Sequence, residues 1–186
     1  MRKVLIGFLA MSLCVLGLGA MWIVRADDDD TVKFTANLDG FQEVPAILSE
    51  GKGTLTLTLN RVAKTFKFEL TYSGLSAPVT QSHIHFGRVH TPGGIMVFFC
   101  TNKGNGPAGT PLCPTSGGTM TVTGTRSAGD VLALSGQNVT AGDFDAIEDA
   151  LLSNSAYANV HTVNFPAGEI RGQIRLESRR RDRDDK

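Results

Sequence analysis

Residues 54–59 read Thr-Leu-Thr-Leu-Thr-Leu, an unbroken alternation of polar and apolar side chains. Successive side chains of a β-strand point to opposite faces, so this pattern predicts a strand with leucines on a buried face and threonines on an exposed one. Residues 32–38 alternate in the same way before an Asp39-Gly40 turn, and residues 66–72 alternate after a hairpin connection at 60–64. These runs predict antiparallel strands with one face in a core.

The rest of the chain continues the pattern, broken by Gly and Pro. Further strands are predicted at residues 95–100, 119–123, 131–134, 157–163 and 169–176. One segment differs, because residues 140–143 (Thr-Ala-Gly-Asp) resemble a capping box, and Phe144, Ile147 and Leu151 follow at helical spacing. Its acidic residues suit the helix dipole, and the alternative of a calcium site lacks EF-hand spacing. The fold class predicted is all-β, an antiparallel sandwich or barrel with one short helix.

The N-terminus has the pattern of an export signal. Arg2 and Lys3 precede an apolar run over residues 4–24, and Val-Arg-Ala at 24–26 is an acceptable cleavage site. We therefore expect a signal peptide over 1–26 and a periplasmic, secreted or cell-surface protein. The run is nearly the roughly 20 residues that span a bilayer, so an uncleaved anchor is the alternative. An acidic linker (27–31), a single domain (32–176) and a charged, disordered tail (177–186) follow.

The charge distribution argues against nucleic acid as a partner. The formal net charge is 0, and the basic run at 179–181 is offset by nearby aspartates. A membrane is expected as a partner only if the N-terminal segment is retained. The expected partner is instead an extracytoplasmic protein or surface ligand. No nucleophile arrangement, phosphate loop or cofactor fingerprint is present in the sequence, so we do not expect an enzyme.

Export also bears on the cysteines. Cys100 and Cys113 are the two that follow the apolar run, and they flank a Gly/Pro-rich segment. In an oxidising compartment such a pair most simply forms a disulfide, which predicts a closed loop here.

The four histidines raise the main functional question. His83 and His85 share one face of a predicted strand, His90 follows five residues later, and His161 lies in a distant strand. With Ile84 and Phe86 facing the core, these histidines face outward, as does His161 when Val160 faces inward. They could form a surface cluster that binds copper or zinc, with His90 as a fourth ligand, or a structural hydrogen-bond cluster. Redox activity would further require an open coordination position.

Three charged residues near the ends of the domain form a second candidate group. Glu169 and Arg171 alternate outward in the last predicted strand, and Glu43 lies near the beginning of the domain. If the first and last strands are neighbours, a structural ion pair among Glu43, Glu169 and Arg171 is expected.

Several segments together resemble the CHRD (chordin) domain family. They are residues 34–40 with Glu-Val-Pro at 43–45, His-Ile-His-Phe-Gly at 83–87, Tyr-Ala-Asn-Val-His-Thr at 157–162 and Gly-Glu-Ile-Arg-Gly-Gln at 168–173. Ala46 departs from the family pattern, which usually has a second proline there. The resemblance implies an immunoglobulin-like or Cu/Zn superoxide dismutase-like sandwich, and the chain is similar to the single-domain, exported bacterial members. Growth-factor binding, known for animal chordin, should not be transferred to it.

The resemblance and the residues together lead to two hypotheses. The first is an exported, non-enzymatic CHRD-domain protein that acts as an extracytoplasmic binding or structural module. The alternative is a copper- or zinc-binding metalloprotein that uses the histidine cluster, with redox activity as a further step. His-x-His on a strand resembles the copper ligands of Cu/Zn superoxide dismutases in geometry, without a wider sequence match.

Overall fold

The computed structural model describes residues 30–115 and 118–177. The predicted signal peptide, most of the acidic linker and nearly all of the charged tail lie outside these ranges. Within them, no helix has the length and hydropathy needed to cross a membrane.

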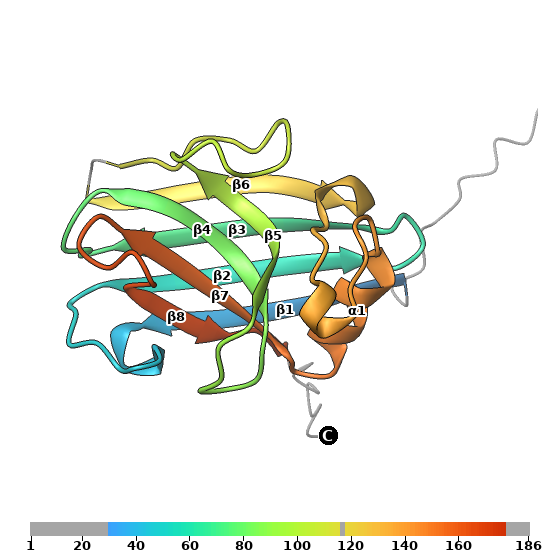
Figure 1. The fold of residues 1–186 in the computed structure, drawn as a ribbon, viewed down its shortest axis with the longest axis horizontal. Coiled ribbons are helices and arrows are strands. Elements are labelled where there is room, and N and C mark those ends of the chain that lie inside the picture. The colour runs from blue at the N-terminus through green and yellow to red at the C-terminus, as the bar shows by residue number, and fades with distance from the viewer. Residues whose placement is uncertain (1–29, 116–117, 178–186) are drawn as a thin grey trace, which may run out of the picture.

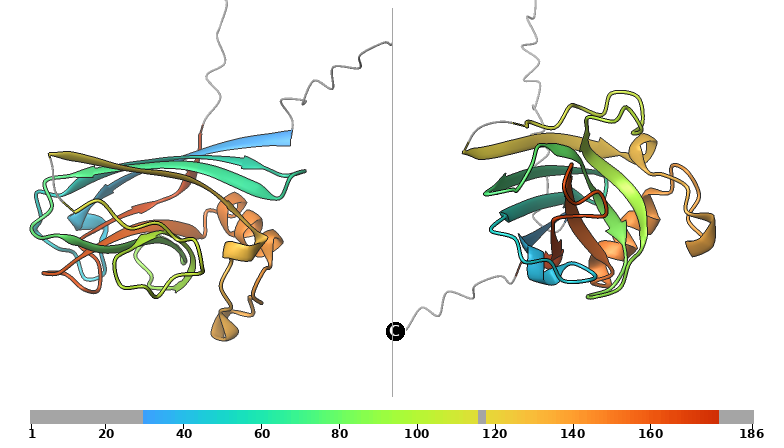
Figure 2. Two further views of the ribbon diagram at one scale, coloured as in Figure 1. Left: turned by 90° about the horizontal axis from the view of Figure 1, so that it is seen from above. Right: turned by 60° about the vertical axis from the view of Figure 1, so that its left-hand side comes forward.

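The described residues form a nearly closed antiparallel barrel of nine strands, flattened into two layers (Figures 1 and 2). The strands are β1 (Thr31–Asp39), β2 (Lys52–Asn60), β3 (Thr65–Ser73), β4 (Val79–Phe86), β5 (Gly94–Thr101), β6 (Thr119–Ser127), β7 (Ala156–Thr162), β8 (Ile170–Gln173) and β9 (Arg175–Leu176). Their order is β5-β4-β7-β8-β1-β2-β3-β6, with β9 also paired to β1. The predicted all-β class with one short helix is confirmed.

The alternating runs form the layer that contains β1, β2 and β3. The hairpin joining β2 to β3 keeps register over nine residue pairs, from Lys52 opposite Ser73 to Asn60 opposite Thr65. Its leucines and aromatic residues are buried in the core, and the threonines of β2 face outward. Each buried Leu contributes on the order of 2 kcal/mol relative to exposure. A slip of one residue in register would move all of these leucines to the exposed face, so the alternating pattern specifies the register of these strands.

An arginine joins the two edge strands of the barrel. Arg126 in β6 donates from Nε to the carbonyl oxygen of Phe98 (2.8 Å) and from Nη2 to that of Phe99 (2.8 Å), both in β5. Its guanidinium also lies 5.3 Å from the ring centroid of Phe68. A side chain therefore satisfies two carbonyls of an edge strand that has no backbone ladder at this position.

The short helix α1 (Phe144–Leu152) covers one end of the barrel (Figure 1). Phe144 packs against Phe66 with ring centroids 6.4 Å apart. The N-cap is Asp143, whose carboxylate accepts from the backbone N–H of Ala146 (3.1 Å), so Thr140 is not the cap that the sequence suggested.

Salt bridges from the β2–β3 hairpin hold the helix. Glu148 accepts from Arg61 (2.7 Å) and Lys64 (3.2 Å), and Asp145 accepts from Lys64 (2.6 Å). Acidic residues of the helix are therefore paired with cations, which gives no support to the calcium alternative.

The strand predicted at residues 131–134 is wrong. This segment lies between the 3₁₀ turns η3 (Ala128–Asp130) and η4 (Ser135–Gln137), and it forms only an isolated bridge between Leu134 and Val139. Val131 is buried, so the apolar residues of this segment pack in the core without pairing as a β-strand.

Candidate metal site

Strands β4, β7 and β8 are buried on both faces, unlike β2 and β3. Their inner side chains, such as Ile84 and Val160, belong to the apolar core. Their outer side chains are mostly polar, and the register aligns them across the three strands. These outer residues are Gln81, His83, His85, Tyr157, Asn159, His161, Arg171 and Gln173.

Loops cover this outer face and hydrogen-bond to it. They span residues 87–93, 102–112 and 163–169. The three histidines are therefore buried, with exposed fractions of 0% for His83, 8% for His85 and 5% for His161. The expectation of a surface cluster is wrong in this respect, because alternation gives the face that a side chain takes but not what covers that face.

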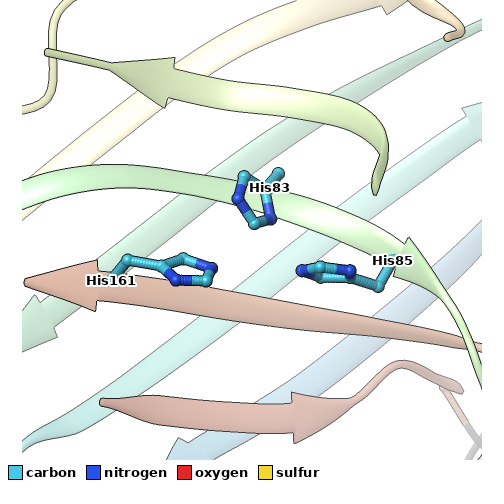
Figure 3. A group of neighbouring side chains, drawn as sticks. All are labelled: His83, His85 and His161. Carbon is cyan, nitrogen blue, oxygen red and sulfur yellow. The ribbon is translucent and has the colours of Figure 1, made fainter. Parts of the chain in front are cut away.

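The three histidines lie together because β4 and β7 are neighbours (Figure 3). Gln81 is opposite His161 and His83 is opposite Asn159, so His83 and His161 meet diagonally across the two strands. The ring centroid of His83 lies 4.5 Å from that of His85 and 4.5 Å from that of His161. One ring nitrogen from each residue lies within 4.8 Å of the others.

Two backbone carbonyls fix the tautomers of His85 and His161. Nδ1 of His85 lies 2.8 Å from the carbonyl oxygen of Gly93, and Nδ1 of His161 lies 3.0 Å from that of Pro166. A carbonyl oxygen only accepts, so both Nδ1 atoms carry the hydrogen and both Nε2 atoms keep a lone pair. A carbonyl that orients the far side of an imidazole is the usual outer partner of a metal-binding histidine.

The remaining ring nitrogens have no protein partner. Nε2 of His85, Nε2 of His161 and both nitrogens of His83 are buried without a hydrogen bond in the described structure. A buried polar atom left unpaired costs about 1–3 kcal/mol, so four of them at one point require an explanation.

Burial keeps these imidazoles neutral. It lowers the pKa of His85 and of His161 to about 4, and it lowers the pKa of His83 well below the ordinary 6.5. The positive charge of Lys103 acts in the same direction on His83 and His161. At neutral pH all three are in the form that binds a metal ion.

His90 does not join the cluster. Strand β4 ends at Phe86, and the chain turns so that His90 is exposed, with a left-handed φ of 56°. The group of candidate ligands contains only His83, His85 and His161, so His90 as a fourth ligand is wrong for the described structure.

Two residues that the sequence did not single out for the cluster fix its His85 ring. Tyr157, opposite His85, stacks on it with centroids 4.6 Å apart and an interplanar angle of 6°. The guanidinium of Arg171 lies 3.4 Å from the centroid of the same tyrosine ring, and its Nη2 donates to the carbonyls of Arg88 (2.8 Å) and Thr91 (3.0 Å). The signal for Tyr157 was its position on the face of β7 shared with His161.

The ion pair expected among Glu43, Glu169 and Arg171 is not formed, since these described residues make no salt bridge with one another. The strands are neighbours as supposed, with Asp39 of β1 opposite Arg171 of β8. The guanidinium of Arg171, however, points to Tyr157 and to the loop carbonyls.

The two glutamates have different surroundings. Glu169 accepts from the hydroxyls of Ser49 (2.7 Å), Ser76 (2.9 Å) and Thr162 (2.7 Å). Burial acts to raise the pKa of Glu169, but these hydrogen bonds outweigh it and lower that pKa. Burial raises the pKa of Glu43 to about 7 despite the charge of Arg171, and its Oε1 has no partner.

The predicted disulfide between Cys100 and Cys113 is confirmed. Both residues are buried, and the bridge ties the end of β5 to the loop that follows it. This loop carries Lys103 and also Asn105, whose Nδ2 donates to Oε1 of Gln81 (3.0 Å) on the polar face. The disulfide thus fixes one of the covers over the histidines.

The arrangement fits a transition-metal ion. Metal–imidazole bonds are about 2.0–2.1 Å long, which puts nitrogens around a trigonal ion about 3.5 Å apart. The ligand atoms lie within 4.8 Å, so shifts on the order of 1 Å would close the site. Imidazole nitrogens suit copper and zinc, whereas calcium and magnesium require oxygen ligands.

The family model described as the CHRD domain matches residues 34–174. No curated protein matches the chain.

Proposed function

Because the chain belongs to the CHRD domain family, we propose that it is an exported, non-enzymatic binding module whose ligand is a single transition-metal ion, copper or zinc. His83, His85 and His161 hold that ion. Family membership supports a binding or structural module. The main observation in favour of a bound metal ion is the set of four buried ring nitrogens without protein partners.

The structural hydrogen-bond cluster is the competing explanation for the histidines. Such a cluster would pair the rings with one another or with neighbouring side chains. His83 makes no hydrogen bond at all in the described structure, and the other two rings bond only through Nδ1. The unpaired nitrogens of all three residues are near one another, which favours a shared ligand.

Export rests on two features of the chain. Basic residues followed by a long apolar run have the pattern of a signal peptide, with a retained anchor as the alternative. The Cys100–Cys113 disulfide suits an oxidising compartment, such as the periplasm, the cell surface or the medium. A partner outside the cytoplasm, either a protein or a surface ligand, would then receive or supply the ion.

Burial supports binding rather than turnover. Each candidate ligand atom without a partner has almost no exposed surface, and loops cover the face on which the histidines lie. A catalytic metal keeps a coordination position open to substrate. A closed site of three imidazoles is suited to holding an ion.

Metal stoichiometry tests the proposal. The full chain, purified without a polyhistidine tag and stripped with chelator, is titrated with Zn²⁺ and, without oxygen, with Cu⁺, and bound metal is measured by native mass spectrometry. We expect one ion per chain, none in His83→Leu, and one in the control His90→Leu, which changes an exposed histidine outside the cluster. Absence of binding, or equal loss in both variants, would contradict the proposal.

A further inference from the structure

We infer that the ion held by His83, His85 and His161 is Cu⁺ in preference to a divalent ion. The inference rests on the proposed function, because it assigns the charge and coordination of the ion in the same site. The ligand set, the charges around it and the burial of the rings support it independently.

The ligand set provides three neutral donors and no anion. The candidate group, taken over the described residues, contains three histidines and neither a carboxylate nor a cysteine. Zn²⁺ in proteins is almost always four-coordinate, and its fourth ligand is a protein group or a water. Cu²⁺ prefers a tetragonal set of ligands. Cu⁺ forms stable trigonal complexes, for which three imidazoles are sufficient.

Two positively charged residues belong to the elements that surround the histidines. Lys103 belongs to the loop at 102–112 that covers the face on which the histidines lie. The guanidinium of Arg171 lies 3.4 Å from the ring centroid of Tyr157, and that ring stacks on His85. Repulsion from a fixed cation doubles when the charge of the bound ion doubles. These neighbours therefore disfavour a divalent ion more than a monovalent one.

Burial acts in the same direction. His83 packs edge-on against the ring of Phe98, with centroids 5.1 Å apart, and Tyr157 stacks on His85. The Born cost of moving an ion into such surroundings grows as the square of its charge, so it is about fourfold larger for a divalent ion. Without an anionic ligand, the protein offsets little of that difference.

Competition titrations on the full chain test the inference. Bicinchoninate competes for Cu⁺ without oxygen, and chelators of known affinity compete for Zn²⁺ and Cu²⁺. We expect one Cu⁺ per chain, bound at least about 100-fold more tightly than either divalent ion. Tighter binding of Zn²⁺ or Cu²⁺ at the three histidines would overturn the inference and leave the proposed function standing. If no ion binds, both fail.

A charge variant provides a second arm that does not touch the ligands. Lys103→Gln removes the exposed cation and should strengthen Cu⁺ binding about threefold and Zn²⁺ binding about tenfold. The matched control is Lys67→Gln, an exposed lysine in β3 of the opposite layer, and it should change neither affinity. Equal effects of Lys103→Gln on the two ions would contradict the electrostatic part of the inference.

Discussion

Replacing His83 by leucine should stabilise the metal-free protein while abolishing metal binding. His83 is fully buried, and neither ring nitrogen has a hydrogen-bond partner in the described structure. Leucine has a similar volume and no polar atom, so the change removes two unpaired groups without breaking a bond. Gains in stability from removing a functional group are typical of binding sites.

The two nitrogens set the magnitude. An unpaired buried polar atom costs about 1–3 kcal/mol, and imperfect packing of leucine in place of a planar ring offsets part of the gain. We therefore expect the free energy of unfolding to rise by about 1–3 kcal/mol. For a domain of this size, that corresponds to an increase in melting temperature of about 3–10 °C.

The assay is urea unfolding of the chelator-stripped chain at pH 7.5, followed by circular dichroism. His161→Leu is the contrast, because it leaves the carbonyl of Pro166 without the hydrogen bond at 3.0 Å and should give no comparable gain. A loss of more than about 1 kcal/mol in His83→Leu would refute the reasoning. It would mean that the His83 nitrogens are satisfied in the metal-free protein, as in a structural hydrogen-bond cluster.

Four further predictions concern stability. Burial lowers the pKa of His85 and of His161 to about 4, so the unfolded chain binds more protons than the folded chain below pH 7. The free energy of unfolding, measured in urea titrations, should therefore fall by about 2 kcal/mol for each of the two histidines as the pH drops from 7 to 5. The contribution of Glu43 to stability has the opposite sign: its pKa is raised to about 7, so the folded chain binds more protons at this residue and is stabilised as the pH drops. Glu43→Gln removes this contribution and should increase the loss of unfolding free energy between pH 7 and pH 5 by about 2 kcal/mol. The double variant Cys100→Ala/Cys113→Ala should lose about 3 kcal/mol in chemical denaturation, from the loop-closure entropy of a bridge with a sequence separation of 13. Arg126→Met should lose about 3 kcal/mol in the same measurement, because it leaves two edge-strand carbonyls unpaired.

Local patterns predicted the parts of the fold that depend on local physics. The alternation in β1, β2 and β3 and the helical spacing after Asp143 each identify an element, because side-chain period follows backbone geometry. The segment at 131–134 failed, because a short apolar run can be buried without joining a ladder.

The site depended on long-range arrangement that the sequence does not encode locally. His83 and His161 come together only because β4 pairs with β7, and strand order across a sheet follows from the packing of the whole chain. The histidines were expected on the surface, but loops cover the face on which they lie, so the cluster is buried. The guanidinium of Arg171 likewise stacks on a tyrosine ring and does not pair with a carboxylate. A tyrosine ring and loop carbonyls compete with a carboxylate on a neighbouring strand for the same guanidinium.

A crystal structure of the metal-loaded full chain, with anomalous scattering at the metal edge, tests the central claim most directly. The account predicts one anomalous peak about 2.0–2.1 Å from Nε2 of His85, Nε2 of His161 and one ring nitrogen of His83. Metal found at the exposed His90, or no peak among the three buried imidazoles, would contradict it.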